Sequence, residues 1–441
     1  MRRMPFHMRL MSIALLALAG CSPKKVPVEE ISGRVDLDDT AAAPIVVSEE
    51  DWNSWRGPSG NGIAADQEVP IRWSETENVI WKAKVPGRGH ASPTVVGDQV
   101  FLASADERAE TQFVVALDRS NGQQRWQTQV NQGGFAREVH AKGTQANSTL
   151  ACDGEHVFAA FLHHDAIHVT AISIDGELAW QTTVGAFNSK FGYAPSPLIY
   201  KTSVIIAADN RGGGYIAALD RSTGEPIWRK RRGAVSTYSS PIVGHVDGKD
   251  QLLITGGDAV TSYDPATGEE NWSVPGTSEA TCGTVVWDAN HVYASGGYPD
   301  SHTLCIRVDG DATEVWSNRT KLYEPSMLVS DGFLYAVSDQ GIGFCWDAET
   351  GDQMWKKRLG GNFSSALVLA GDKLFATADD GTCTVFAADS SDYIELARNR
   401  LGTDAYATPT ICGGRTYFRV GQGDGPQRQE MLYCIGEPHE N

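Results

Sequence analysis

A phrase of Asp, two or three turn residues, Gly and then Trp recurs along the chain and restricts its fold more than any other feature. The four full copies begin at Asp118, Asp220, Asp264 and Asp347 and end at Trp126, Trp228, Trp272 and Trp355. Asp and Ser/Thr side chains hydrogen-bond the backbone of a tight turn, Gly supplies a positive φ, and Trp buries a large ring. The phrase therefore predicts a hairpin between two strands that is repeated along the chain.

A second signal precedes each hairpin: a small residue or proline, then an apolar run, then a Gly/Asp turn. Two hairpins per repeat give four strands in roughly 40 to 50 residues, which is the size of a propeller blade. We therefore predict an all-β, eight-bladed propeller of four-stranded antiparallel blades. The second signal begins at Ser92, Ser148, Ser196, Ser240, Gly283, Pro325, Ser365 and Thr408.

The two ends of the repeat region are each incomplete, and the defects are complementary. The last copy contains three strands, whereas Trp81, in NVIWKAKVP, resembles an outermost strand with no strands before it. Joining the two completes the eighth blade and leaves no open sheet edge between first and last blades. We expect the propeller to cover residues 81–436, with the turn-rich segment 51–80 packed on the disc.

The first residues predict export. Arg2, Arg3 and Arg9 precede an apolar run, 10–19, that is too short to span a bilayer, so residues 1–20 are expected to be a signal peptide. The run ends in LAGC, which resembles the bacterial lipobox and predicts lipidation at Cys21. Residues 21–50, rich in Pro, Ala, Lys and acid, are expected to form a flexible tether. The expected location is the cell envelope, as an outer-membrane lipoprotein facing the periplasm.

The net charge limits the classes of binding partner, and the cysteines are assigned to lipidation and to the core. A net charge of -18 argues against binding of nucleic acid, or of anionic lipid by the whole surface, so membrane attachment would come from acyl chains. Of eight cysteines, one is the expected lipid site, and an odd number remains. Cys305, Cys345 and Cys434 lie in apolar strand-like runs, which predicts core packing.

With these residues assembled, the chain resembles the PQQ-like β-propeller repeat superfamily over about residues 51–436. This superfamily includes the outer-membrane assembly lipoprotein BamB and the propellers of quinoprotein dehydrogenases. The likeness to BamB implies a non-catalytic scaffold with a protein partner in envelope protein assembly. The likeness to the dehydrogenases implies an adjacent cysteine pair and calcium ligands, but the sequence has no Cys-Cys and the ligands cannot be placed. An oxidoreductase that uses PQQ with calcium therefore stays an alternative without supporting site residues, as does a polysaccharide-binding propeller.

Other catalytic and metal motifs are weak. His163, His164 and His168 lie across an expected hairpin turn without further ligands at motif spacing, so a polar turn is preferred to a zinc site. No nucleophile elbow or phosphate loop is recognisable. We therefore predict no catalytic residue, no metal and no cofactor.

The segments that follow each Trp cross one face of the disc to the inner strand of the next blade. They are rich in Lys and Arg, and an aromatic residue or histidine often stands shortly before the inner strand. We predict a funnel at the central mouth that receives a protein partner or an anionic or extended ligand. The alternative, in which the basic residues are solvated and the aromatic residues pack between blades, stays open. The candidate funnel residues are His90, Arg137, His140, Tyr193, Arg231, Arg232, Tyr238, Tyr323, Arg358, Phe363 and Tyr406.

Overall fold

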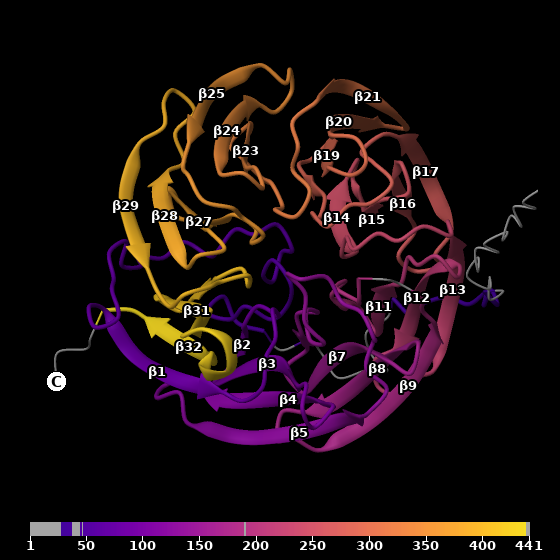
Figure 1. Cartoon of the computed structure of the whole chain (residues 1–441). Coiled ribbons are helices and arrows are strands. Elements are labelled where there is room, and N and C mark those ends of the chain that lie inside the picture. Colours follow the sequence, from indigo (N-terminus) through magenta and orange to yellow (C-terminus); the bar gives the residue numbers. More distant parts are fainter. Residues whose placement is uncertain (1–27, 38–44, 46, 189–190, 438–441) are drawn as a thin grey trace, which may run out of the picture.

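Eight four-stranded antiparallel sheets form a closed ring, which confirms the predicted eight-bladed propeller (Figure 1). The structure, a computed structural model, describes residues 28–37, 45, 47–188 and 191–437. The predicted signal peptide and lipid site at Cys21 lie outside these residues. Within the described residues, no helix is both long and apolar enough to span a bilayer.

The first four blades follow one another along the chain. Blade 1 contains β2 (Thr94–Val96), β3 (Gln99–Asp106), β4 (Thr111–Asp118) and β5 (Gln124–Gln132). Blade 2 contains β6 (Ala151–Cys152), β7 (His156–His163), β8 (Ala166–Ser173) and β9 (Leu178–Ala186). Blade 3 contains β10 (Leu198–Tyr200), β11 (Ser203–Ala207), β12 (Gly214–Asp220) and β13 (Pro226–Arg232). Blade 4 contains β14 (Ile242–Val246), β15 (Lys249–Thr255), β16 (Ala259–Tyr263) and β17 (Glu270–Pro275).

The remaining blades complete the circle. Blade 5 contains β18 (Val286–Trp287), β19 (His291–Gly296), β20 (His302–Asp309) and β21 (Asp311–Asn318). Blade 6 contains β22 (Leu328–Ser330), β23 (Phe333–Val337), β24 (Ile342–Asp347) and β25 (Gln353–Arg358). Blade 7 contains β26 (Val368–Ala370), β27 (Lys373–Thr377), β28 (Thr382–Ala387) and β29 (Glu395–Arg400). Blade 8 contains β30 (Thr410–Cys412), β31 (Arg415–Gln422), β32 (Gln429–Ile435) and β1 (Val79–Val85), with a short 3-10 turn, Gly425–Gln427, before β32.

The repeated Gly and Trp fasten neighbouring blades together. In the second full copy of the phrase, Gly224 has a φ of 77°, and a Cβ there would lie 2.5 Å from the ring of Trp180 in blade 2. The indole nitrogen of Trp180 donates to the carbonyl of Arg221 in the same turn at 3.0 Å. The same ring-on-turn contact joins Trp81 to Gly122 and Trp228 to Gly268. In these three joints the turn therefore covers the tryptophan of the preceding blade.

The ring is closed by both ends of the propeller, as the sequence predicts. β1 pairs with β32 in antiparallel register, with Trp81 opposite Cys434. On the channel side, the hydroxyl of Thr410 in blade 8 donates to the carbonyl of Pro93 in blade 1 at 2.6 Å. Inside blade 8, Arg419 and Glu430 form a buried ion pair at 2.9 Å. Sheet pairing, a hydrogen bond and buried charge thus hold blade 8 together and join it to blade 1.

The turns and crossings define two faces of the disc. The turns between first and second strands and between third and fourth strands, such as Gly97–Asp98 and Arg119–Ser120, lie on one face, which we name the turn face. The crossings between blades lie on the other, which we name the funnel face.

The segment before β1 covers the central channel from the turn face, and we name residues 52–64 the plug. Its backbone pairs with Val95 at one end and with Leu369 near the other. In between, the guanidinium of Arg56, 2% exposed, donates to the carbonyl of Met327 at 2.8 Å. The plug therefore contacts the inner region of blades on opposite sides of the ring.

The region 21–50 differs from the expected tether in its described part. Residues 28–36 are docked on blade 3, where Ile31 forms an antiparallel bridge with Arg229 and Val35 is 1% exposed. The apolar Val28, Ile31 and Val35, spaced along a run of mixed composition, were too sparse to predict this contact.

The seven described cysteines are all free thiols. Cys305, Cys345 and Cys434 are buried, as their apolar sequence context predicts.

Candidate functional site

A cavity of about 610 Å³ occupies the centre of the funnel face, and we name it the funnel. Residues from most of the crossings line it, together with the tip of the β11–β12 connection at Arg211 and the β19–β20 connection at Tyr298. Five of the predicted candidates are among its lining residues, namely His90, His140, Tyr238, Tyr323 and Tyr406.

The plug supplies the floor of the funnel. Trp55 lines the cavity, and its indole nitrogen donates to the hydroxyl of Thr284 at 2.8 Å. The channel is therefore closed beneath the funnel, so a ligand reaches it from the funnel face.

Hydroxyl side chains form a belt around the same level. One residue occupies the equivalent position in each blade, two before the first paired residue of the inner strand. The backbone nitrogen of Ser92 donates to Thr149 at 3.0 Å, that of Thr149 to Ser196 at 3.0 Å, and that of Ser196 to Ser240 at 2.9 Å. Blade 7 lacks the hydroxyl. The belt positions are Ser92, Thr149, Ser196, Ser240, Thr284, Ser326, Ala366 and Thr408.

Aromatic rings surround the mouth above the belt. His90 stacks on Tyr406 with ring centroids 4.4 Å apart. Phe191 lies edge-on to His140 at 5.5 Å and also contacts Tyr238 at 6.5 Å. Such rings present flat apolar surfaces with polar edges, which suit binding of an extended chain.

One ionic cluster spans the mouth. Lys142, from the crossing between blades 1 and 2, places its Nζ 3.1 Å from Glu324 and 3.0 Å from Asp379. These carboxylates belong to the opposite side of the ring, before blade 6 and within blade 7. Ser364 adds a hydroxyl acceptor at 3.2 Å from Nζ. We name Lys142, Glu324, Asp379 and Ser364 the latch, because they join the 133–148 crossing to the far side of the funnel.

The electrostatics of the funnel follow from burial and from these charges. Burial and the nearby Arg88, Arg419 and Arg428 hold the pKa of His90 well below its usual value, so its ring is neutral at physiological pH. Burial lowers the pKa of Lys142, but the carboxylates of Glu324 and Asp379 outweigh this effect and raise it. Lys142 therefore stays charged, as the latch requires.

The other predicted candidates lie outside the funnel. Tyr193 and Phe363 are 5% and 2% exposed and pack in apolar clusters between blades, as the alternative interpretation of the aromatic residues holds. Tyr193 also donates its hydroxyl to the carbonyl of Ala207 at 3.1 Å. Their position shortly before an inner strand predicts proximity to the channel but does not reveal which way the side chain points.

The basic candidates are likewise not collected at the funnel. Arg232 is engaged by Asp209 at 2.8 Å, and Arg231 donates to the carbonyl of Val28 at 3.1 Å on the outside of blade 3. Arg358 is exposed at the end of β25, and Arg137 borders a separate cavity beside blade 2. These four basic residues do not line the funnel, where the charged lining groups among the described residues are Lys142, Glu324, Arg211 and Lys321.

Some lining residues were missed by sequence reasoning. Trp55, Phe191 and Tyr298 line the funnel although they lie outside the positions used to predict it. Trp55 belongs to a turn-rich aromatic stretch whose packing on the disc was expected, but its place in the channel had no sequence signal. Tyr298 lies in a connection of blade 5 that the crossing pattern does not include.

The funnel does not fit the calcium-bound quinone of dehydrogenase propellers. Among its lining residues Glu324 is the single carboxylate, and it is already engaged by Lys142. The described residues contain no group of three or more His, Cys, Asp or Glu arranged to hold a metal ion. No chemical step is therefore assigned to such a cofactor.

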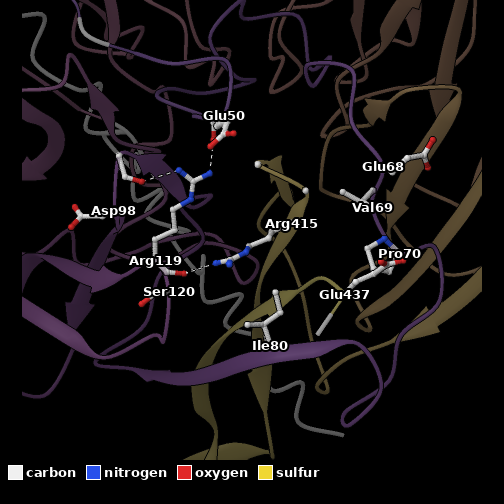
Figure 2. Close-up of a pocket in the computed structure, with 13 residues that line it drawn as sticks. Glu50, Glu68, Val69, Pro70, Ile80, Asp98, Arg119, Ser120, Arg415 and Glu437 are labelled. Atoms are coloured by element: carbon white, nitrogen blue, oxygen red, sulfur yellow. Dashed lines mark hydrogen bonds between the residues drawn. The ribbon is translucent and has the colours of Figure 1, made fainter. Parts of the chain in front are cut away.

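A second cavity, of about 760 Å³, lies on the turn face at the closure of the ring (Figure 2). Arg119 stands at its centre and donates to Asp51 at 3.2 Å, to the carbonyl of Gly97 at 2.8 Å and to the hydroxyl of Tyr417 at 3.2 Å. Arg415 donates in turn to the carbonyl of Arg119 at 3.1 Å. Because all three guanidinium nitrogens of Arg119 are used by the chain itself, we interpret this cavity as a structural joint between the chain ends.

Known proteins share this architecture. The factor BamB of Burkholderia pseudomallei, an outer membrane protein assembly factor, is 25% identical over 339 residues, which cover 76% of this chain and 72% of that protein. The crystal structure of BamB from Moraxella catarrhalis superposes with a TM-score of 0.58 at 14% identity, covering 81% of this chain and 99% of that one. Quinohemoprotein alcohol dehydrogenase from Comamonas testosteroni superposes with a TM-score of 0.63 at 13% identity, covering 92% and 84%. At these identities the two solved structures show the fold alone.

The family assignment rests on the repeats. The family model described as outer membrane protein assembly factor BamB matches residues 63–190, 110–352 and 308–394, three overlapping stretches that together take in most of the propeller. The closed ring and the recurring turn phrase agree with the family match. The chain therefore belongs to the PQQ-repeat propeller family of the outer membrane protein assembly factor BamB.

Proposed function

We propose that this chain is a non-catalytic scaffold of outer-membrane protein assembly, held at the membrane by a lipid on Cys21, which faces the periplasm and receives an extended segment of a protein partner in the funnel. Membership of the BamB family and the lipobox-like sequence support the role and the location. The funnel supports the mode of binding.

The exposed apolar surface of the funnel carries this proposal. Eight large apolar side chains are exposed among the described residues, and two of them, Phe191 at 39% and Tyr298 at 62%, line this one cavity. Exposed aromatic groups concentrated at a concave site are typical of protein-binding surfaces. Arg211 and Lys321 add positive charge beside them, which favours a partner segment with acidic residues.

The test is capture of partners by the intact lipoprotein from its own membranes. Tyr298→Ala and Phe191→Ala should each weaken capture, because they remove contact area while costing the fold little. Leu178→Ala and Met354→Ala are matched controls, since these residues are 50% and 43% exposed on outer strands away from the funnel. Equal capture by all four variants would contradict binding at the funnel.

A charge variant separates electrostatic attraction of the partner from direct aromatic contact with it. Lys321→Glu should weaken capture most at low salt, because screening shortens the reach of exposed charges, whereas the loss in Tyr298→Ala should persist at high salt. Addition of PQQ with calcium chloride provides the comparison with the dehydrogenase alternative. Stoichiometric uptake accompanied by dye-linked oxidation of an alcohol would overturn the scaffold proposal.

A further inference from the structure

Residues 28–36, which we name the strap, form a fixed addition to the outside of blade 3. The nitrogen of Ile31 donates to the carbonyl of Arg229 at 3.1 Å, and the nitrogen of Arg229 donates back to Ile31 at 2.9 Å. Val35 is buried in the cluster that contains Trp228. Its nitrogen donates to the carbonyl of Ala266, in blade 4, at 2.8 Å.

The fit of the strap depends on a glycine. A Cβ at Gly33 would lie 2.1 Å from the carbonyl oxygen of Ile227, so any side chain there would push the strap away from β13. At one end Arg231 donates to the carbonyl of Val28 at 3.1 Å, and at the other Thr202 donates to the carbonyl of Asp36 at 3.0 Å. Contacts along the whole segment hold it in one place.

The strap has a defined direction on the disc. β13 runs from the turn face at Pro226 to the funnel face at Arg232, and the strap runs antiparallel to it. Asp36 therefore lies at the turn face, beside the β10–β11 turn, and Val28 lies towards the funnel face. Figure 1 shows the indigo start of the described chain against the outer side of β13. Val28, the first described residue, therefore lies at the funnel-side rim of blade 3.

We infer that this rim is the surface by which the propeller meets the phospholipid bilayer. The inference rests on the proposed lipidation of Cys21. Cys21 and Val28 are seven positions apart in the sequence, and a fully extended chain of seven steps spans at most about 25 Å. The lipid-bearing residue therefore stays within that distance of Val28, whereas the rim of blade 7, across the ring, is turned away.

Local charge is compatible with the same surface. The strap and β13 together contain five basic and three acidic residues, and two of the bases, Lys230 and Arg232, pair with Glu269 and Asp209, so this region is close to neutral in a chain whose net charge is -18. A neutral region is repelled less by anionic headgroups than the rest of this acidic protein is. The funnel then opens on the side of the disc from which the anchor leaves, so a partner segment enters it close to the membrane.

The experiment uses the intact lipoprotein bound to vesicles of phosphatidylethanolamine and phosphatidylglycerol that carry a headgroup quencher. A fluorophore is attached to a cysteine introduced either at Ala234, after β13 in blade 3, or at Arg400, the exposed end of β29 in blade 7, in a Cys282→Ala background. Both positions lie on the funnel face, so they differ chiefly in their place around the ring. We expect quenching several-fold stronger at 234 than at 400.

Two variants test whether the docked strap sets the orientation of the disc on the vesicle. Gly33→Val should bring quenching at the two positions close together while the protein remains on the vesicles, because the released strap lengthens the free tether. Ser32→Val adds the same side chain at the exposed neighbouring residue and should preserve the difference. Bound protein with equal quenching at both positions would overturn the orientation and leave the proposed function intact. Failure of the protein to bind the vesicles would instead overturn lipid anchoring itself.

Discussion

Lys142 and Glu324 are 182 positions apart in the sequence, yet their side chains meet at 3.1 Å across the mouth of the funnel. The contact joins the long crossing between blades 1 and 2 to the opposite side of the ring. Because Lys142 is about one third exposed, the contact is accessible to salt and to competing charges. We therefore expect high salt to loosen the hold of this crossing on the far side of the funnel.

Removal of the latch should open the funnel to small reagents. Cys282 lines the cavity and is the one described cysteine that is not buried, so its modification reports access. Lys142→Met should increase the rate at which a neutral maleimide labels Cys282 several-fold, measured on the Cys282 peptide by mass spectrometry. High salt should have the same effect on the wild type. Lys84→Met, on exposed β1, is the control, and an unchanged rate in Lys142→Met would show that the crossing does not cover the funnel.

The Gly–Trp contact between blades should be measurable as stability. Gly224→Ala combines a positive φ of 77° with a clash on Trp180, whereas Gly310→Ala has a φ of 73° and open space around the new Cβ. Backbone strain alone should cost about 1 kcal/mol in Gly310→Ala. Crowding should add about 1–3 kcal/mol in Gly224→Ala. Urea unfolding measures both, and equal losses would mean that the ring contact adds nothing.

The belt offers a paired test of one hydrogen bond. Ser196→Ala removes the acceptor of the buried nitrogen of Thr149 and should lower the free energy of unfolding by about 1–3 kcal/mol. Ala366→Ser supplies the hydroxyl that blade 7 lacks, at the belt position that Thr149 and Ser196 occupy in their blades. This variant should raise the free energy of unfolding by about 0.5–1 kcal/mol. Thermal and denaturant unfolding of the two variants are compared with the wild type. A loss of stability in Ala366→Ser would contradict the equivalence of these positions.

His90 should make stability depend on pH. Its pKa in the folded state lies well below the ordinary value, so the unfolded chain binds a proton near pH 6.5 that the folded chain does not. The contribution of His90 to the free energy of unfolding is therefore constant above about pH 7.5 and falls as the pH drops through 6.5. His90→Phe keeps a ring against Tyr406 and should flatten this decline, seen as a stability difference that favours the variant increasingly towards pH 5. Parallel pH profiles would contradict a neutral His90.

Most of the fold can be predicted from the repeated Asp, Gly and Trp phrase. The Asp, Gly and Trp of each phrase are needed together because the turn requires a positive φ and then receives the preceding tryptophan ring, as Gly224 and Trp180 show. Such a requirement explains why the full phrase recurs in four blades, at Asp118, Asp220, Asp264 and Asp347. The orphan strand at Trp81 and the missing last strand of blade 8 then determine how the ring closes.

The funnel is less visible in the sequence because it is assembled from unlike segments. Tyr193 and Tyr238 occupy similar places before inner strands, but Tyr193 is held by the Ala207 carbonyl in a core between blades while Tyr238 lines the cavity. Side-chain direction in a crossing depends on its length and on contacts with other crossings. The latch illustrates the same point, since no local pattern relates Lys142 to residues across the ring.

Because β1 pairs with β32, the ring can close only after the last strand of the propeller has been made. β1 is synthesised long before residues 429–435 that pair with it, so it stays unpaired until the end of the repeat region has been made. A chain interrupted before β32 would leave β1 and β31 without their shared neighbour, and such unsatisfied strands invite aggregation and proteolysis. The last strand of the chain therefore decides whether the backbone groups of β1 and β31 are paired or left exposed.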